Sequence, residues 1–391
     1  MNPEKHPLYE WLKEIRRDFH MHPETAFQEF RTTDRIKSLL TEMGIQLQEL
    51  DGLETGAAGV IEGKPGGKTI ALRADIDALP LTELNDAPYK STIEGAMHAC
   101  GHDAHMTIML GVAKNLKDTG LDKAIKGRVK FIFQPAEERL AGAQKMIDAG
   151  VLKNPGVDRI AACHVFPDLE VGRACVYKGV SHAAADHFRL VIQGKGSHGA
   201  HPEHGNDPIV AGAFFVAGIQ SIVSRNISPL EPGVVTVGSF HSGTVGNIIP
   251  AAAELQGTVR SLNPKVREEL GKRMREMAGG LETTFGVSVA LDYQQGVPAC
   301  INDETVTAAL FEASSKVVGR ENVGQLGPTM GSEDFGLFTQ LVPGSIMYLG
   351  CANQARGLVN KLHSPHFDLD EAVLPIGVEI FTEAVKEYLR R

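Results

Sequence analysis

The sequence contains few aromatic residues and few cysteines. Aromatic residues make up 6% of the 391 residues, and the single tryptophan, Trp11, lies near the N-terminus, so no aromatic-lined pocket is evident. The five cysteines are odd in number and widely spaced, which excludes a disulfide framework. This use of cysteine favours a reducing compartment, and we expect a cytoplasmic protein.

Long apolar runs and basic tracts are also lacking. No uninterrupted run of about 18 apolar residues occurs, so we expect no membrane-spanning segment. The first stretch, MNPEKHPLYEWLKEIRRDFH, is charged from the start and lacks the apolar core of a signal peptide. The net charge is -9 and no basic tract is present, which argues against nucleic-acid binding. We therefore expect neither a membrane nor a nucleic acid as a partner.

The sequence does contain an alternation of helix and strand patterns. Residues 9–19 and 30–44 place apolar residues at intervals of three and four, which predicts two helices. Apolar runs typical of buried strands occur at 69–77, 129–134 and 159–166. Helical stretches lie between them, at 105–118 and 141–150. Alternating strands and helices indicate an α/β domain with a mainly parallel sheet.

A different pattern occupies the middle of the chain. Strands are predicted over 187–194, 234–240, 253–262 and 288–294, and helices over 207–226 and 264–285. Asn263 as a cap and Pro264 in the first turn mark the start of the second helix. The order β-α-β-β-α-β is ferredoxin-like. We predict a larger domain of residues 1–180 and 301–391 and an inserted domain of residues 181–300. The last predicted elements of the larger domain are a strand and a C-terminal helix.

The stretch HACGHDAH holds the first candidate ligands, Cys100 and His102. In an extended segment, residues two apart project from the same face, so both side chains can reach one metal cluster. A thiolate and an imidazole suit zinc, and also manganese, cobalt or nickel. The alternative is a glycine-containing polar turn.

The stretch FIFQPAEE holds two adjacent carboxylates. A predicted strand ends at Gln134, Pro135 breaks it, and Glu137 and Glu138 follow. Adjacent side chains point in different directions, so one carboxylate can bind metal while the other takes a proton from a metal-activated water. The alternative is a solvated pair favoured by a helix start.

Two further histidines complete the candidate set. His164 lies at the end of an apolar strand, where sites on parallel sheets gather, and the alternative is a core histidine. His363, in LHSPHFDLD, returns after the insertion, and the alternative is a surface loop. The first four candidates, Cys100, His102, Glu138 and His164, are all expected just after strands of one domain. Five ligands and a spare glutamate match a two-metal hydrolytic site with ions roughly 3.5–4 Å apart.

The motifs taken together resemble a known family. The strings that carry the resemblance are RRDFHMHPETAFQE, RADIDALP, HACGHDAHM, QPAEE, GSHGAHPEHGNDPI, GNIIP, GTVRSL, GSEDF and LHSPHFDLD. They resemble the amidohydrolase branch of the aminoacylase/carboxypeptidase metallopeptidases, which includes hippurate hydrolases, indole-acetyl-amino-acid hydrolases and N-acetyl-diaminopimelate deacetylases. The resemblance covers nearly the whole chain. It implies a two-metal catalytic domain and an inserted lid domain that also mediates dimerisation.

Carried over by motif, the resemblance assigns the site residues. The implied metal ligands are Cys100, His102, Glu138, His164 and His363. Glu137 is the implied general base. Asp75 takes a position where other branches carry a metal-binding histidine, and we expect it to support the ligands by hydrogen bonding. The alternative for Asp75 is a capping or turn aspartate.

The same resemblance implies three substrate contacts, two of them in the inserted domain's loops and one in a strand. His198 is expected to stabilise the oxyanion, from the lid and often from the partner subunit, although His201 and His204 lie close by. Asn247 is expected to donate to the oxyanion or to the substrate carboxylate, and the alternative is a turn role. Arg260 is expected to anchor the carboxylate, and the alternative is a surface ion pair.

The implied reaction is hydrolysis of the amide in an N-acyl amino acid by a water that bridges two divalent ions and is activated by Glu137. Manganese and zinc are the leading metals, and nickel and cobalt follow. The small-molecule substrate is the expected partner, with a homodimer through the inserted domain or a tetramer. The alternatives are a dipeptidase or carboxypeptidase of the same family, and a metal-dependent binding protein without catalysis. The adjacent Glu137 and Glu138 argue against the last, because a binding protein needs no spare base.

Overall fold

The computed structural model describes residues 2–389, which divide into two compact units. Of the described residues, the first unit contains 2–181, 301–327 and 334–389, and the second contains 182–300 and 328–333. The short segment 328–333 returns to the second unit after the insertion. The expected boundaries left that segment in the larger domain, because nothing in its sequence marks it as separate.

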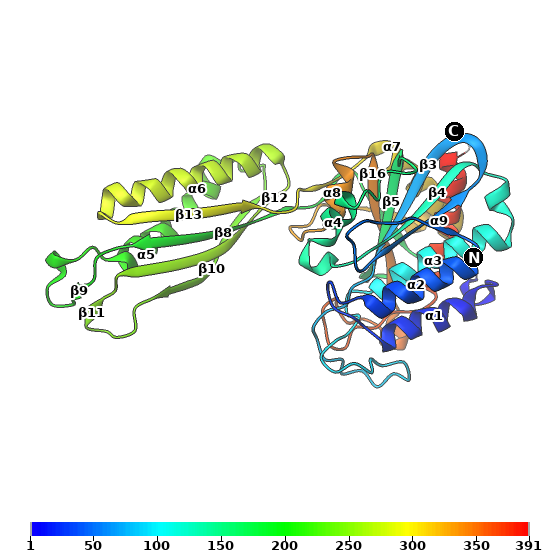
Figure 1. The fold of residues 1–391 in the computed structure, drawn as a ribbon, viewed down its shortest axis with the longest axis horizontal. Helices are drawn as coiled ribbons and strands as arrows, with labels where there is room; N and C mark the ends of the chain where they lie inside the picture. Colours follow the sequence, from blue (N-terminus) through cyan, green and yellow to red (C-terminus); the bar gives the residue numbers. More distant parts are fainter. Residues whose placement is uncertain (1, 390–391) are drawn as a thin grey trace. The chain divides into compact units, whose positions relative to one another are not determined.

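An eight-stranded sheet forms the centre of the first unit (Figure 1). Its spatial order is β1 (Gln46–Leu47), β2 (Ala57–Glu62), β4 (Lys126–Gln134), β3 (Lys64–Asp75), β5 (Arg159–Glu170), β16 (Gly344–Ala352), β6 (Ala174–Tyr177) and β15 (Val323–Leu326). The four central strands β4, β3, β5 and β16 are parallel. All nine residues of β16 are buried, as expected for a strand covered on both faces. The predicted mainly parallel α/β architecture is confirmed.

Helices pack on this sheet and complete its core. They are α1 (Tyr9–Met21), α2 (Phe30–Glu42), α3 (His102–Asp118), α4 (Gly142–Asp148), α7 (Glu304–Val318), α8 (Phe335–Thr339) and α9 (Val373–Leu389). The amphipathic helix α1 packs against α3, and α3 packs against α9 and β3. The helix α3 is buried along nearly its whole length, so its first turn is held firmly at the carboxyl end of the sheet. A two-stranded sheet of β7 (Gly179–His182) and β14 (Cys300–Asn302) lies where the chain passes between the units.

The second unit is an antiparallel sheet with helices packed on it (Figure 1). The strands lie in the order β10 (Gly233–Ser242), β12 (Ala252–Ser261), β8 (Ala184–Gln193) and β13 (Ser288–Gln295). Helices α5 (Pro208–Gly218) and α6 (Pro264–Phe285) cover it, and β9 (Ser197–His198) pairs with β11 (Ile248–Ile249) beyond it. The Asn263 side chain accepts from Lys265 N, which confirms the predicted cap of α6. The ferredoxin-like order β-α-β-β-α-β is also confirmed.

The first helix of this unit differs from its prediction. We expected one helix over 207–226, but α5 ends at Gly218 and a π-helical turn spans Ile222–Asn226. By length and composition alone, Pro208–Asn226 is apolar enough to cross a membrane, and 33% of its most apolar window is buried. The expectation of no membrane-spanning segment stays a prediction. Polar Gln, Ser and Arg residues interrupt its last third, so no continuous apolar run is visible in the sequence.

Candidate metal centre

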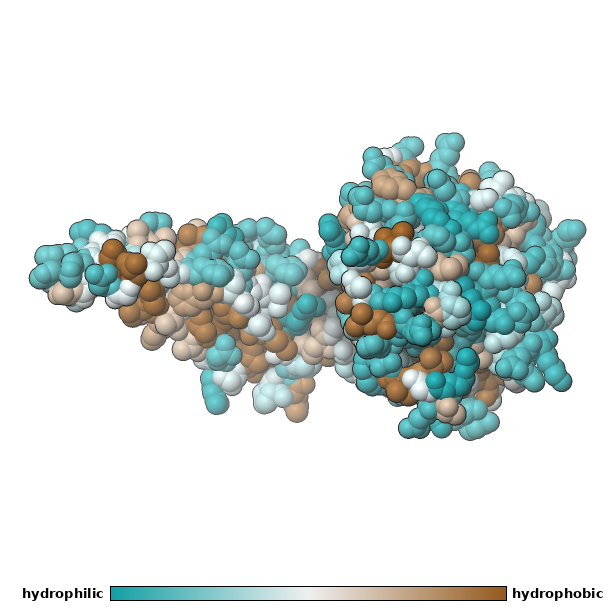
Figure 2. Space-filling view, turned by 90° about the horizontal axis from the view of Figure 1, so that it is seen from below, coloured by the Kyte–Doolittle hydropathy of each residue, from teal (hydrophilic) through white to brown (hydrophobic). Residues whose placement is uncertain are grey.

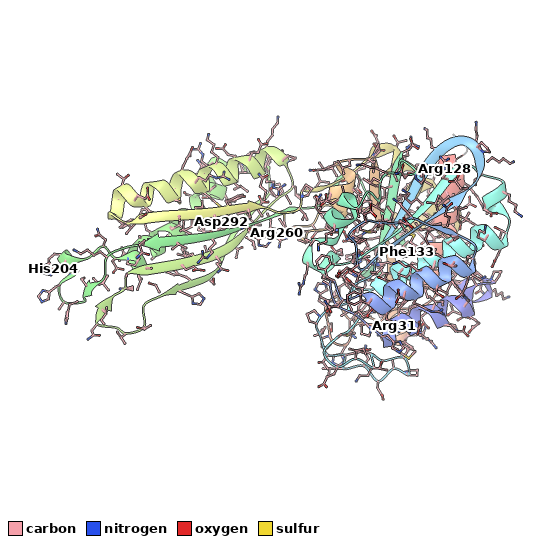
Figure 3. All side chains as sticks on the ribbon, viewed as in Figure 1. Arg31, Arg128, Phe133, His204, Arg260 and Asp292 are labelled. Carbon is pink, nitrogen blue, oxygen red and sulfur yellow. The ribbon has the colours of Figure 1, made fainter. Side chains whose placement is uncertain are left out.

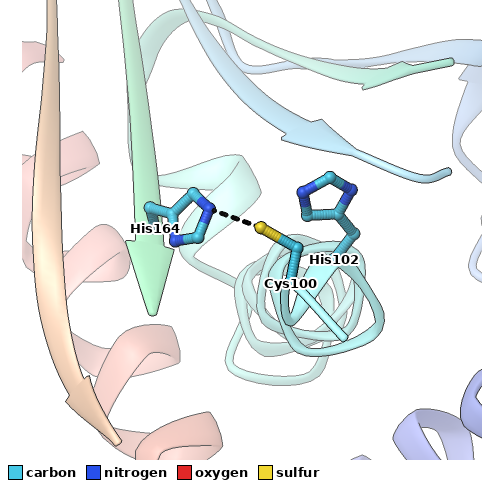
Figure 4. Close-up of side chains that lie close together, drawn as sticks. All are labelled: Cys100, His102 and His164. Atoms are coloured by element: carbon cyan, nitrogen blue, oxygen red, sulfur yellow. Dashed lines mark hydrogen bonds between the residues drawn. The ribbon is translucent and has the colours of Figure 1, made fainter. Parts of the chain in front are cut away.

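Three predicted ligands meet at the carboxyl end of the first unit's sheet. The ligand atoms of Cys100, His102 and His164 all lie within 4.8 Å of one another, and the three side chains face a common space (Figure 4). The Cys100 thiol lies 3.4 Å from His164 Nε2. All three residues are at most 9% exposed. Such a buried group of sulfur and nitrogen donors has the composition of a transition-metal site.

Glu138 and His363 extend the cluster. The ligand atoms of Cys100, Glu138 and His363 form a second group within 4.8 Å. Glu138 Oε1 lies 4.0 Å from His102 Nε2 and 3.4 Å from His363 Nε2. The His363 backbone N–H donates to Ala99 O at 2.8 Å, which ties its loop to the segment that carries Cys100. The structure thus brings together all five side chains that the sequence selected.

Backbone carbonyls orient two of the imidazoles. His102 Nδ1 donates to Asp77 O at 2.8 Å, and His164 Nδ1 donates to Val165 O at 2.7 Å. A proton on Nδ1 leaves the Nε2 lone pair available, which is the arrangement of a metal-binding histidine. In both residues Nε2 is the atom that faces the cluster.

Two orphaned atoms show that the residues fit a metal. His102 Nε2 and Glu138 Oε1 are buried, and neither has a hydrogen-bond partner within residues 2–389. An unpaired buried polar atom is costly, and a cation between them would satisfy both. The chemistry of the donor set and these two orphaned atoms therefore both match a bound divalent ion.

The strand β4 delivers the two glutamates through a tight turn. The strand ends at Gln134, as predicted, and a short 3₁₀ helix spans Glu137–Arg139. Ala136 and Leu140, at its two ends, have left-handed backbones with φ of 51° and 52°. Glu137 is 7% exposed, and a carboxylate oxygen of Glu137, one of Glu138 and a ring nitrogen of His102 lie within 4.8 Å of one another. The turn places a second carboxylate directly beside the ligand cluster.

Asp75 supports the cluster from the end of β3. Its carboxylate accepts from His105 Nδ1 at 2.6 Å and from Arg73 at 2.7 Å. His105 Nε2 in turn accepts from Val165 N at 2.9 Å, which connects Asp75 to the strand that carries His164. Asp75 Oδ1 lies 3.8 Å from His102 Nε2. These contacts agree with a hydrogen-bonding role and do not support the capping alternative.

Sequence reasoning overlooked Asp77. Its carbonyl binds His102 Nδ1, its Oδ1 lies 3.2 Å from the same nitrogen, and its Oδ2 accepts from Glu138 N at 3.0 Å. One residue therefore orients an imidazole and the backbone of a carboxylate ligand. The motif RADIDALP could have revealed Asp77, because Asp75 and Asp77 are two residues apart. Residues with this spacing at the end of a strand project from the same side.

The pKa values of the cluster reflect burial and close charges. Burial raises the pKa of the Cys100 thiol well above its usual range. Burial opposes protonation of His102, but the Asp75 carboxylate and Cys100 outweigh it and raise its pKa. Burial and the neighbouring imidazole of His105 lower the pKa of His164. Burial opposes ionisation of Glu138, but its contact with His363 prevails and lowers its pKa.

Three local expectations were wrong. The segment Cys100–His102 is not extended, because Gly101 has φ of 87° and His102 begins α3. A Cβ at Gly101 would lie 2.3 Å from Val165 Cγ2, so this turn requires glycine. Cys100 does not follow a strand directly, because a long connection separates it from β3. His164 lies in the middle of β5 rather than at its end. The tertiary fold, not local spacing, brings these ligands together.

Aromatic side chains lie beside the cluster, although the composition did not reveal them. The rings of Phe166 and Tyr348 stack at 4.6 Å, and the Tyr348 ring lies 5.8 Å from that of His164.

The three predicted substrate contacts lie in the second unit, but not together. His198 in β9 and Asn247 before β11 share one hairpin, where Gly199 N donates to Asn247 O at 2.8 Å. Arg260 lies at the other end of β12, where it binds Ser332. Ala252, next to the hairpin, and Arg260 are eight residues apart in one strand, roughly 27 Å. His204, near the hairpin, and Arg260 are widely separated in Figure 3.

The fold and the grouped side chains define a metal-dependent hydrolase. A model of peptidase family M20/M25/M40 matches residues 71–387, and the chain belongs to this family. It is 39% identical over 372 residues to the N-acetylcysteine deacetylase of Bacillus subtilis, with 95% of each chain covered. It is 38% identical to thermostable carboxypeptidase 2 of Saccharolobus solfataricus, with 95% of this chain and 93% of that protein covered.

A solved structure agrees with this assignment. The YXEP protein of Bacillus subtilis, described as a dinuclear metal-binding peptidase of the M20 family, superposes with a TM-score of 0.86 at 35% identity. The match covers 98% of this chain and 99% of that one. The predicted family and the metal-dependent hydrolase class are confirmed.

Proposed function

We propose that the protein hydrolyses the amide bond of N-acyl amino acids and releases a carboxylic acid and a free amino acid. The observation that carries this proposal is the second carboxylate, Glu137, beside the cluster of five candidate metal ligands. A site that only stores metal has no use for a buried base at that position. The similarity to an N-acetylcysteine deacetylase supports the substrate class.

The ligands of two divalent ions would be Cys100, His102, Glu138, His164 and His363. The cysteine and the three imidazoles suit zinc, and manganese is the other leading candidate, followed by nickel and cobalt. When bound, the ions would polarise the acyl carbonyl and make a water molecule more acidic. Asp75 and Asp77 would keep the ligands in place through the contacts described above.

Glu137 would act as the proton carrier of the reaction. Its carboxylate takes a proton from the attacking water and then delivers it to the leaving amine. Because Glu137 and Glu138 are consecutive residues on one rigid turn, the base lies at a fixed place relative to a ligand. Holding a catalytic group in a fixed geometry relative to the reacting atoms lowers the barrier of the reaction.

His198 would donate to the developing oxyanion. Its Nδ1 accepts from Ala200 N at 3.0 Å, so the proton of the neutral ring resides on Nε2, where it can be donated outward. Asn247 is exposed in the same hairpin and would donate from its amide. Arg260 would bind the substrate carboxylate with the guanidinium nitrogens that it does not use for Ser332.

A single second unit does not bring His198 and Arg260 to one small substrate, because they lie at opposite ends of the sheet. If both contact the substrate, His198 would come from a second copy of the chain. Two features support such a dimer. Helix α5 exposes an apolar face of Ile209, Val210 and Phe214. The strand β10 pairs on one edge only within the described residues, and it contains no Asp, Glu, Lys or Arg.

These two features adjoin each other. A Cβ at Gly212 of α5 would lie 2.6 Å from the Phe240 ring of β10, so the helix rests directly on the edge strand. Apolar side chains gather on the face of this unit seen in Figure 2. An open, uncharged edge beside an apolar helix invites pairing with another chain. Two copies joined by their β10 strands would cover both surfaces symmetrically.

A second candidate function is that of a carboxypeptidase or dipeptidase. The similarity to a thermostable carboxypeptidase favours it, and the same metal centre would hydrolyse a peptide bond. A panel of N-acetyl and N-benzoyl amino acids, measured beside peptides with a free amino terminus, separates the two.

The test combines metal analysis with hydrolysis of that panel before and after chelation. The proposal expects about two ions per chain and release of free amino acid that stops on chelation and returns with metal. Preferred turnover of free-amine peptides would favour the second candidate. Metal without hydrolysis of any substrate would favour a binding protein, and hydrolysis without metal would contradict both.

A further inference from the structure

Glu29 is a buried carboxylate that the site described above does not use. It lies in the motif RRDFHMHPETAFQE, which contains two glutamates near the start of α2. Glu24 has an evident local role, because its carboxylate accepts from Arg31 N at 3.0 Å and Thr32 N at 2.7 Å and so caps the helix. Glu29 is fully buried and does not cap α2 with its side chain.

The Glu29 side chain reaches a distant segment instead. Its Oε1 accepts from the backbone N–H of Ala136 at 2.9 Å. Ala136 is the residue with φ of 51° that opens the turn carrying Glu137 and Glu138. A non-glycine residue holds this conformation only when its surroundings enforce it. The bond from Glu29 is therefore one of the restraints that fix the turn.

Close packing provides further restraints, beside the bond from Asp77 to the Glu138 amide. A Cβ at Gly142 would lie 1.5 Å from Pro135 O, so the chain returns directly against the start of the turn. A Cβ at Gly56 would lie 2.8 Å from Pro135 Cδ, so a second loop presses on the same residue. These contacts hold Pro135 in place, while the Ala136 amide is held by Glu29.

The contact with Glu29 does not depend on charge. Burial raises the pKa of Glu29, and an uncharged side chain with a carbonyl oxygen satisfies the Ala136 amide equally well. Glutamine retains this acceptor, and methionine has a similar length but lacks it.

We propose that Glu29 is a positioning residue: by holding the Ala136 amide, it fixes the turn from which Glu137 and Glu138 reach the metal centre. The catalytic part of this inference rests on the proposed function. A shift of the base by about 1 Å is enough to lower turnover about 100-fold.

The first experiment measures amide exchange in the metal-free protein and needs no activity. In Glu29→Met the amides of 136–138 should exchange about tenfold faster than in wild type, because one restraining hydrogen bond is gone. The matched control is Glu24→Met, which removes a carboxylate from the same helix start. Its exchange in 136–138 should equal that of wild type. Unchanged exchange in Glu29→Met, or equal acceleration in Glu24→Met, would overturn the inference.

The second experiment measures kcat and KM separately on the best substrate of the panel. Glu29→Met should lower kcat about 100-fold with little change in KM, and Glu29→Gln should restore kcat to within about threefold of wild type. If Glu29→Met does not fold, Glu29→Gln alone tests the inference. A kcat of Glu29→Gln as low as that of Glu137→Gln would contradict the role of Glu29 as a hydrogen-bond acceptor. If wild type hydrolyses nothing, the proposed function fails, and the exchange comparison still tests Glu29.

Discussion

His102 Nε2 and Glu138 Oε1 face each other at 4.0 Å, and neither has a hydrogen bond within residues 2–389. We predict that Glu138→Gln lowers the metal content from about two ions per chain to about one or fewer, because a neutral amide is a weak ligand. Metal analysis of the dialysed protein measures this. The control is Glu268→Gln, an exposed carboxylate of α6, which should keep the wild-type content. An unchanged content in Glu138→Gln would show that the two orphaned atoms do not share an ion.

Metal affinity should rise with pH. Burial raises the pKa of the Cys100 thiol well above its usual range. The Cys100 thiol therefore carries a proton in the metal-free protein near neutral pH, and metal binding must displace it. Acid therefore favours the metal-free form, and the apparent Kd should fall about tenfold or more per pH unit between about pH 6 and about pH 8. Competition with a chelator measures this, and an affinity independent of pH would contradict it.

Most of the fold and the ligand set was predictable from sequence. The buried runs of β4, β5 and β16 alternate with helices, and that alternation determines the sheet class. No single motif was decisive, and the candidate ligands were selected because the motifs occur together in one chain and because they resemble one family. The predicted cap at Asn263 depended only on local chemistry, and it was correct.

The remaining features depend on contacts between distant parts of the chain. The bonds from Glu29 to Ala136 and from Asp77 to Glu138 join segments that local patterns do not relate. The left-handed conformation of Gly101 was missed because spacing alone cannot distinguish an extended segment from a turn that starts a helix. The end of α5 at Gly218 was missed for a similar reason, because apolar residues continue beyond it.

Lys130 should stabilise the fold in a pH-dependent way. Its buried ammonium donates to the carbonyls of Val151, Lys153 and Pro155 at 2.8 to 2.9 Å. Burial lowers its pKa from 10.5 to about 8. Between these values the unfolded chain binds the proton more tightly than the folded chain, so the contribution of Lys130 to stability rises as the pH increases through this window.

Urea unfolding of Lys130→Met tests this prediction. The variant should be less stable by about 3 kcal/mol near pH 7, because three carbonyls lose their donor. The difference from wild type should grow by about 1–3 kcal/mol towards pH 10. The exposed Lys123→Met is the control and should show neither effect. If the difference in unfolding free energy between wild type and Lys130→Met stays constant or shrinks as the pH rises, the predicted direction of the pH dependence is wrong.

Phe214 should maintain the proposed dimer. It is 58% exposed on α5, beside the open edge of β10. Phe214→Glu would bury a charge in a symmetric interface and should yield a monomer by light scattering coupled to size exclusion. Phe30→Glu changes a phenylalanine of the first unit that is 46% exposed, and it should leave the wild-type dimer intact. A monomeric wild type, or a dimeric Phe214→Glu variant, would contradict an interface on this face.

The central claim is that Glu137 supplies a base beside a metal cluster that Glu138 helps to form. The most direct measurement is the turnover of Glu137→Gln on an N-acyl amino acid, with metal content determined on the same sample. We predict wild-type metal content, an unchanged fold and a loss of kcat of about 1,000-fold or more, since the amide cannot take the proton. A metal-replete Glu137→Gln protein with near wild-type turnover would show that Glu137 is not the base.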